Sequence, residues 1–250
     1  MATQTVPVNL DPIAAYDRIA PVFARIAEKR KPYLDSIDRL VISLIPPQSH
    51  SMLDVGSGDG RRARRIAQQR DIADLVLMEP SVAMQGSDAE IRTLRAEELH
   101  LIEGEFDVIT CLWNVLGHIF PASSRAEVLR QFARLVSPHG RIFVDVNHRY
   151  NARHYGAIPT TLRFLYDALK WSERNGDAVV SWDVEQVHCS TQGHVFTHPE
   201  FRSIIHAAGL NIETRFVVDY ATGECRRWSI QGHLLYVLSR TAFPSVQQTS

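Results

Sequence analysis

Residues 53–60 read Leu-Asp-Val-Gly-Ser-Gly-Asp-Gly, so glycines at 56, 58 and 60 follow directly after an apolar run that begins at Met52. The apolar run predicts a short buried strand, and residues 61–69 after the glycines have the apolar spacing of a helix. Glycine lets the backbone turn tightly between a strand and a helix, and it leaves room for a ligand to approach. This pattern is typical of a cofactor-binding loop in an α/β protein.

An acidic residue follows at the distance that such a loop requires. Glu79 comes at the end of the apolar run Leu75–Met78, about 20 residues after the glycines, where a carboxylate can accept both hydroxyls of a ribose. The G-x-G-x-G spacing differs from the G-x-G-x-x-G of dinucleotide-binding enzymes and counts against a nicotinamide dehydrogenase. A structural turn in some other α/β protein remains the alternative.

Strands and helices alternate over most of the chain, which predicts an α/β fold with a mostly parallel sheet. Residues 1–12 are expected to be a loose lead-in, and two helices broken near Pro32 should cover residues 11–45. Further helices are expected at 61–69, 126–135, 162–171 and 199–208. Strands are expected at 52–55, 75–78, 106–112, 141–146, 179–184, 187–195, 213–218 and 233–238.

Composition narrows the class of protein. The 250 residues fit one domain, and 27 Lys and Arg against 28 Asp and Glu leave a net charge of −1. Because the charges balance, the composition does not indicate a protein that binds nucleic acids or acidic membranes through a basic surface. The three cysteines are far apart, and the N-terminus has neither a basic nor an apolar leader segment. We therefore expect a cytoplasmic protein without a disulfide framework, a signal peptide or a membrane span.

The sequence resembles the class I S-adenosylmethionine-dependent methyltransferases over about residues 10–150 and 197–240. The resemblance rests on Asp54–Gly60, on Glu79, on Phe106-Asp-Val-Ile, on the turn Leu135–Gly140 and on the late helix Phe201–Leu210. Tyr16-Asp-Arg-Ile-Ala resembles the N-terminal segment of the family. Shorter stretches at 111–118 and 145–150 are similar to glycine and sarcosine N-methyltransferases.

This resemblance implies a Rossmann-like fold with a mostly parallel seven-stranded sheet flanked by helices and an inserted cap after the fifth strand. Within a single domain we expect N-terminal helices (1–48), a cofactor-binding core (49–146), a substrate cap (147–196), the rest of the core (197–240) and a tail (241–250). The implied cofactor is S-adenosyl-L-methionine, which leaves as S-adenosyl-L-homocysteine. Its expected binding residues are Asp54, Gly56, Ser57, Gly58, Gly60, Glu79, Pro80, Ala96, Glu97, Cys111, Leu112 and Trp113.

The acceptor is expected beyond the ends of the fourth and fifth strands, because open α/β sheets bind ligands there. His118 titrates near neutrality and is the first candidate for a general base, and Tyr16 and His148 are further catalytic candidates. Arg149 and Arg153 could clamp a carboxylate or phosphate. The substrate candidates are Asn114, Asn147, Arg149, Tyr150 and Arg153. No metal is expected, since Asp145 lacks a second and third acidic ligand nearby.

The resulting hypothesis is a methyltransferase acting on a nitrogen or oxygen of a small molecule. The alternatives are a carbon or protein methyltransferase and a non-catalytic protein that binds the cofactor as a partner of another protein. Nucleic acid is not expected as a substrate, because the tetrapeptide of adenine-N6 enzymes and the Pro-Cys of cytosine-C5 enzymes are absent. The basic cluster Arg61–Arg65 is interpreted as a solvated helix face. A homodimer is compatible with the sequence, which does not decide the oligomeric state.

Overall fold

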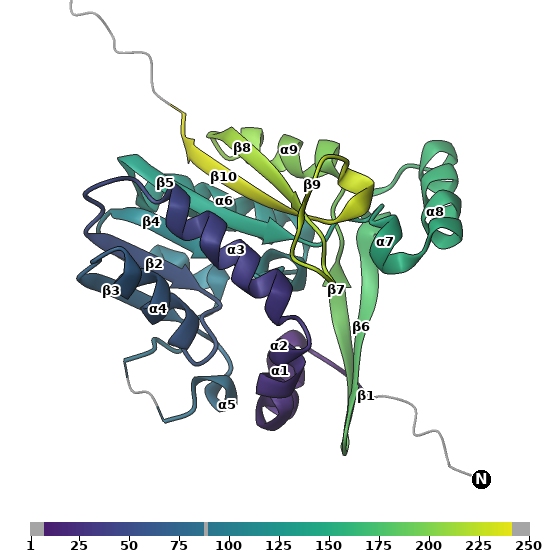
Figure 1. Cartoon of the computed structure of the whole chain (residues 1–250), viewed down its shortest axis with the longest axis horizontal. Coiled ribbons are helices and arrows are strands. Elements are labelled where there is room, and N and C mark those ends of the chain that lie inside the picture. Colours follow the sequence, from purple (N-terminus) through teal and green to yellow (C-terminus); the bar gives the residue numbers. More distant parts are fainter. Residues whose placement is uncertain (1–7, 88–89, 242–250) are drawn as a thin grey trace, which may run out of the picture.

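A seven-stranded sheet forms the centre of the protein (Figure 1). The structure is a computed structural model that describes residues 8–87 and 90–241. The strands of this sheet are β2 (Ser51–Val55), β3 (Asp74–Met78), β4 (Phe106–Cys111), β5 (Val136–Val146), β8 (Leu210–Val218), β9 (Cys225–Arg226) and β10 (His233–Arg240). They lie in the order β3-β2-β4-β5-β10-β8-β9, and the first four are parallel to one another.

Two strands, β10 and the two-residue β9, run against this direction. β10 is antiparallel to both of its neighbours, β5 and β8. It follows β8 through β9 and a 3₁₀ turn at Ser229–Gln231, without a helix that crosses the sheet. Short connections join antiparallel strands, whereas parallel strands need a crossover. The predicted α/β class and seven-stranded sheet are confirmed, with the parallel part on the side of β3.

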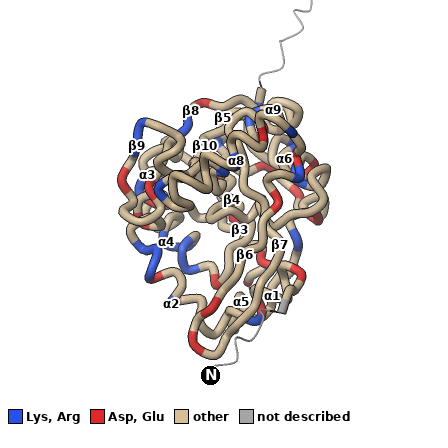
Figure 2. The backbone as a smooth tube through the Cα atoms, turned by 90° about the vertical axis from the view of Figure 1, so that its right-hand side faces the viewer, with Lys and Arg blue, Asp and Glu red and all other residues tan. Residues whose placement is uncertain are grey.

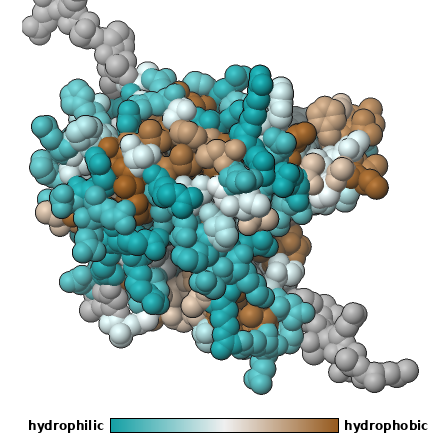
Figure 3. All heavy atoms as spheres, in the orientation of Figure 1, coloured by the Kyte–Doolittle hydropathy of each residue, from teal (hydrophilic) through white to brown (hydrophobic). Residues whose placement is uncertain are grey.

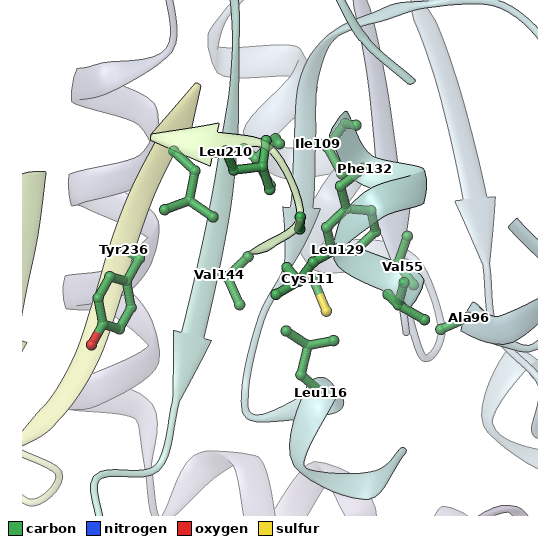
Figure 4. Packing of buried hydrophobic residues seen from close by; sticks show 14 of the residues in the cluster. Val55, Ala96, Ile109, Cys111, Leu116, Leu129, Phe132, Val144, Leu210 and Tyr236 are labelled. Atoms are coloured by element: carbon green, nitrogen blue, oxygen red, sulfur yellow. The ribbon is translucent and has the colours of Figure 1, made fainter. Parts of the chain in front are cut away.

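Helices cover both faces of the sheet, because successive residues of its inner strands point to opposite sides. In β5, Val144 packs with α6 and α9 (Figure 4), whereas Phe143 packs on the opposite face with α3 and α4. The helices are α1 (Pro12–Ile19), α2 (Phe23–Glu28), α3 (Lys31–Leu44), α4 (Arg61–Gln69), α5 (Val82–Gln85), α6 (Ala122–Leu135), α7 (Ala152–Tyr155), α8 (Ala157–Leu169) and α9 (His198–Ala207).

A second, three-stranded sheet lies beside the first. It contains β1 (Val8–Leu10), β6 (Asp177–Val184) and β7 (Val187–His194) in the order β1-β7-β6. Residues 8–10 were expected in a loose lead-in, but they pair in parallel with Cys189–Thr191 of β7. The expectation failed because the partner strand is distant in the sequence, and a three-residue strand has no periodicity of its own.

Several boundaries differ from the predictions: α6, α8 and β8 begin three to five residues earlier than expected, at Ala122, Ala157 and Leu210. The first N-terminal helix is interrupted by a 3₁₀ turn at Ala20–Val22, because Pro21 cannot continue the helical hydrogen bonds. β5 begins at Val136, five residues before the expected Arg141, since residues 136–140 extend along β4 past a register shift. The expectations for residues 1–7 and 242–250 lie outside the described residues. No described helix is both long and apolar enough to cross a bilayer.

Candidate active site

A cavity of about 1120 Å³ lies at the carboxyl ends of β2, β3 and β4. Residues 54–59, Glu79 with Pro80, and Leu112 with Trp113 line it from the strand ends, and α1 and α2 close it from the other side. Ligands bind at this edge of open α/β sheets. The cavity therefore contains most of the residues that the sequence singled out for the cofactor.

The glycine loop forms one wall of the cavity. The N–H groups of Gly56 and Ser57 both donate to the carbonyl of Met78, at 2.8 and 2.9 Å. Gly56 has a φ of +78°, and a Cβ there would lie 2.5 Å from Cγ2 of Val115. Both the backbone conformation and the lack of space require glycine at position 56. Gly60 also has a left-handed φ and starts α4, but it does not line the cavity.

Glu79 joins the loop to the next strand end. Its Oε2 accepts the N–H of Gly58 and its Oε1 accepts the N–H of Ser81, both at 2.9 Å. The side chain is buried at the cavity wall, and burial raises its pKa, although the two backbone donors oppose this effect. Each carboxylate oxygen keeps a further lone pair that can accept a ribose hydroxyl.

Two opposite charges lie at the floor of the cavity. Asp54 accepts a hydrogen bond of 2.5 Å from the hydroxyl of Thr110, and burial raises its pKa to about 6. Arg62 donates from Nε to Asp38 at 2.6 Å, while its Nη2 is buried without a described partner. Since buried donors are almost always paired, Nη2 marks a place for an anionic or carbonyl oxygen. The sequence missed Arg62 because the basic cluster Arg61–Arg65 was interpreted as a solvated helix face; Figure 2 colours these basic residues blue along the tube of α4.

Tyr16 and His118 meet at the other end of the cavity, which both side chains line. The Tyr16 hydroxyl lies 3.2 Å from Nε2 of His118, and Nδ1 of the same ring lies 3.2 Å from the carbonyl of Gln192. Because a carbonyl only accepts, Nδ1 carries the proton and the lone pair of Nε2 accepts from the Tyr16 hydroxyl. Burial lowers the pKa of His118, and burial together with the charge of Glu79 raises the pKa of Tyr16.

Aromatic rings surround this pair. Phe23 and Trp113 line the cavity with ring centroids 5.3 Å apart, and Trp182 packs edge-on against Tyr16 at 5.6 Å. Phe23 comes from α2 and was not assigned a role from the sequence. Only the fold brings it beside Trp113, so no local pattern could have identified it.

Asp145 holds the backbone around Trp113 in place. It accepts from the N–H groups of Trp113 and Asn114, and from the hydroxyl of Tyr33 at 2.7 Å. Trp113 and Asn114 both have a φ of +61°, a left-handed conformation that needs such support in residues other than glycine.

Among residues 8–87 and 90–241, no group of three His, Cys, Asp or Glu side chains could hold a metal ion.

Three expected site residues lie next to the cavity without lining it. The side chain of Asn114 is buried; it accepts the N–H of Asn147 at 2.9 Å and donates to the carbonyl of His194 at 3.4 Å. The backbone N–H of His148 donates to Nδ1 of His233 at 2.9 Å, and its ring is buried. These contacts join the end of β5 to the second sheet and to β10. The structure therefore does not bring Asn114, Asn147 and His148 to the cavity surface.

The residues that were expected to clamp a substrate carboxylate also lie outside the lining of the cavity. Arg149 donates to Asp167 at 2.5 Å, and the hydroxyl of Tyr150 donates to the other oxygen of Asp167, also at 2.5 Å. Arg153 pairs with Asp219 at 2.5 Å. None of the three lines the cavity, and acidic partners in the same region of the fold bind them, although Nε and Nη1 of Arg149 are buried without a described partner. The sequence could not show these pairs, since each partner is 17 or more positions away.

The remaining cofactor candidates divide between the cavity and the core. Pro80, Ala96, Glu97 and Leu112 line the cavity. Cys111 does not: it is fully buried in the cluster between the sheet and α6, which Figure 4 shows. One missed residue is Asp17 of α1, which accepts from the hydroxyl of Ser81 at 2.6 Å and from the N–H of Ala83 at 3.2 Å. Asp17 thus fastens α1 to the start of α5 beside the cavity.

Comparison with known proteins assigns the chain to a protein family. A methyltransferase domain matches residues 23–215. The chain belongs to that methyltransferase domain family. It is a class I S-adenosyl-L-methionine-dependent methyltransferase, as the resemblance of the glycine loop implied. No curated protein sequence matches the chain.

Solved structures share the fold of this methyltransferase at low sequence identity. The CcbJ methyltransferase from Streptomyces caelestis is 14% identical with a TM-score of 0.68, covering 93% of this chain and 100% of that one. The sugar N-methyltransferase KedS8 from Streptoalloteichus is 17% identical with a TM-score of 0.58, covering 97% and 98%. CalS10, an amino pentose methyltransferase from Micromonospora echinaspora solved with S-adenosylmethionine, is 15% identical with a TM-score of 0.55, covering 88% and 97%.

The cofactor of this methyltransferase is S-adenosyl-L-methionine. The described residues fit its chemistry. Asp54 and the unpaired Nη2 of Arg62 offer opposite charges to an amino-acid zwitterion, and Glu79 offers acceptors to a ribose.

Proposed function

We propose that this methyltransferase acts on a nitrogen or oxygen of a small-molecule acceptor bound beside Tyr16, Phe23 and Trp113. The proposal rests on one observation above all: Tyr16 donates to the lone pair of His118 at the cavity wall. Because burial keeps His118 neutral around neutral pH, the pair can accept a proton from an acceptor as it is methylated.

The proton moves in two coupled steps. The acceptor gives its proton to the oxygen of Tyr16 while the Tyr16 hydroxyl proton passes to Nε2 of His118. The imidazolium that results donates from Nδ1 to the carbonyl of Gln192. Since burial raises the pKa of Tyr16, a free tyrosinate is disfavoured and the two transfers are coupled. The cofactor supplies an electrophilic methyl group on a sulfonium.

The other residues of the cavity position the reactants. Glu79 would accept the ribose hydroxyls of the cofactor, Asp54 would bind its amino group, and Arg62 would bind its carboxylate. The aromatic rings of Phe23 and Trp113 would exclude water from the acceptor and orient it for attack. In-line placement and exclusion of water are the main contributions a protein makes to this displacement.

Several observations favour a small amine over the alternatives. Asp17 fastens α1 to Ser81 beside the cavity, so α1 restricts the access of a folded protein substrate. Two structural neighbours are described as sugar or amino pentose methyltransferases. A neutral imidazole is also a better match for the proton of an ammonium than for that of an alcohol. A carbon or protein acceptor and a non-catalytic role remain the alternatives.

The test is transfer of a radiolabelled methyl group from S-adenosyl-L-methionine to a panel of amino sugars, aromatic amines and phenols. We expect turnover with at least one amine, and analysis of the product by mass spectrometry should locate the methyl group on nitrogen. Turnover with a peptide or a carbon acid alone would contradict the proposal. Tight binding of S-adenosyl-L-homocysteine without turnover of any acceptor would favour the non-catalytic alternative.

A further inference from the structure

Helix α8 carries its polar and apolar residues in the reverse of the usual arrangement. Its buried residues are Thr160 and Asp167, and Arg163 between them is half-buried. The opposite face carries four aliphatic residues that are exposed by half or more: Ile158 at 76%, Leu162 at 61%, Leu165 at 50% and Leu169 at 86%. A surface helix normally turns its apolar side to the core. We refer to these four residues as the α8 stripe.

The inner side of α8 is fixed to the protein by polar contacts. Asp167 accepts from Arg149 and from the hydroxyl of Tyr150, each at 2.5 Å, and from Nδ2 of Asn175 at 2.9 Å. Arg149 and Asp167 are both almost completely buried. Removing one partner of such a pair is strongly destabilising, so the pair holds α8 in one rotation about its axis. The α8 stripe is therefore held facing solvent.

The stripe has the spacing that two packed helices use. Its residues follow one another at intervals of four, three and four, which is the repeat of a coiled-coil seam. Figure 1 shows α8 projecting from the side of the protein next to α7, and Figure 3 shows an apolar patch at the same place. Phe164, Tyr166 and Trp171 beside the stripe are also more than half exposed.

We propose that the α8 stripe is the dimer interface between two copies of this chain. The four residues are self-complementary about a two-fold axis between Leu162 and Leu165. In an antiparallel pair, Leu162 meets Leu165 of the second copy, and Ile158 meets its Leu169. Two-fold interfaces use the same patch on both subunits, which this spacing permits.

The area and the charge both favour a second copy. A stable interface takes about 800 Å² from each partner. Phe164, Tyr166 and Trp171 belong to the aromatic class that buries about 150–250 Å² per side chain. Together with the four aliphatic residues of the α8 stripe, all exposed by half or more, they approach that requirement. Helices that lie on membranes need a cationic, solvated face opposite the apolar one. In α8 that opposite face is the one anchored by Asp167 and turned to the protein.

The test is sedimentation velocity of the full chain over micromolar concentrations. We expect wild-type protein to sediment at twice the 28.3 kDa chain mass, and the double variant Leu162→Glu/Leu165→Glu to sediment at the chain mass. Lys170→Glu is the matched control, because it changes the net charge by the same amount at an exposed position outside the stripe. It should remain dimeric. Far-UV circular dichroism and binding of S-adenosyl-L-homocysteine should be unchanged in both variants.

Three results would overturn the proposal. The first is monomeric wild-type protein at every concentration. The second is a double variant that stays dimeric, which would place the interface elsewhere. The third is a monomer that floats with phosphatidylcholine and phosphatidylserine vesicles through the same two leucines, which would make the stripe a membrane contact.

Discussion

The hydroxyl of Tyr16 donates to Nε2 of His118, a residue 102 positions further along the chain, and the pair borders the cavity that takes the cofactor. The direction of this hydrogen bond follows from the other ring nitrogen of His118, because Nδ1 donates to the carbonyl of Gln192. In the proposed mechanism the Tyr16 oxygen is therefore the atom that takes the proton of the methyl acceptor.

Replacing either member of the pair should lower turnover without weakening cofactor binding. Tyr16→Phe and His118→Gln should each reduce kcat by about 10²- to 10⁴-fold, the usual contribution of a positioned general base. The measurement is steady-state kinetics with the best acceptor of the panel, together with calorimetry of S-adenosyl-L-homocysteine. His139→Gln, at an exposed position, serves as the control. Near wild-type kcat in both active-site variants would remove the pair from the mechanism.

The pH dependence should report His118. The base must be neutral, so kcat/KM should fall as pH drops through the pKa of this ring. Because burial lowers that pKa below its ordinary 6.5, the acidic limb should lie below pH 6.5 and the rate should be level around neutrality. The profile of His118→Gln should lack this limb. A limb above pH 6.5, or one that persists in the variant, would contradict the assignment.

Arg62 should recognise the carboxylate of the cofactor. Arg62→Met should weaken S-adenosyl-L-homocysteine by about 10- to 100-fold, since a hydrogen bond to a charged group is worth about 1.5–3 kcal/mol. Binding of 5′-methylthioadenosine, which lacks the amino-acid part, should not change. Arg130→Met on α6 is the control, because that side chain is exposed and does not line the cavity. Equal losses for both ligands would indicate a general disturbance of the loop.

Gly56 should be intolerant of a side chain for a steric reason. Gly56→Ala should abolish binding of S-adenosyl-L-homocysteine, because the new Cβ would lie 2.5 Å from Val115. Gly104→Ala controls for backbone strain: its φ is also positive, but nothing lies within 4 Å of the new Cβ. It should cost about 1–2 kcal/mol in urea unfolding and leave binding intact. Adding Val115→Ala to Gly56→Ala should restore part of the binding, and failure to do so would argue against the clash.

Stability should depend on the buried ring of His148. Burial lowers its pKa to about 4, so below pH 6.5 the unfolded chain takes up a proton that the folded chain refuses. The free energy of unfolding should therefore fall by about 3 kcal/mol between pH 6.5 and pH 4 on account of this group. Urea unfolding should show a shallower pH dependence in His148→Gln than in His139→Gln. Identical pH dependence in the two variants would exclude this role for His148.

The parts of the fold and site that follow from local sequence were predictable. The strand before Gly56, the helix after Gly60 and the placement of Glu79 all depend on residues less than 30 positions apart. The glycine loop and Glu79 accordingly line one cavity in the structure. Short-range patterns suffice here because a strand, a turn and a helix each leave their own periodicity in the sequence.

The parts that depend on distant partners were not predictable. Arg149 and Arg153 looked available for a substrate, but their carboxylate partners come from α8 and from the end of β8. Arg62 looked like part of a solvated cluster, and only the fold places it against Asp38 and the cavity. Val8–Leu10 became a strand because β7 offers it an edge. In each case tertiary contacts decided the outcome, and no local pattern carries them.

Glu79 is expected to bind the cofactor in the cavity beside the glycine loop. Calorimetric titration of wild-type protein and Glu79→Gln with S-adenosyl-L-homocysteine measures this contribution. We predict micromolar binding by the wild type, and a loss of about 10- to 100-fold in the variant, which keeps the size of the side chain but replaces one charged acceptor by a donor. Equal affinity in the two proteins would contradict the account.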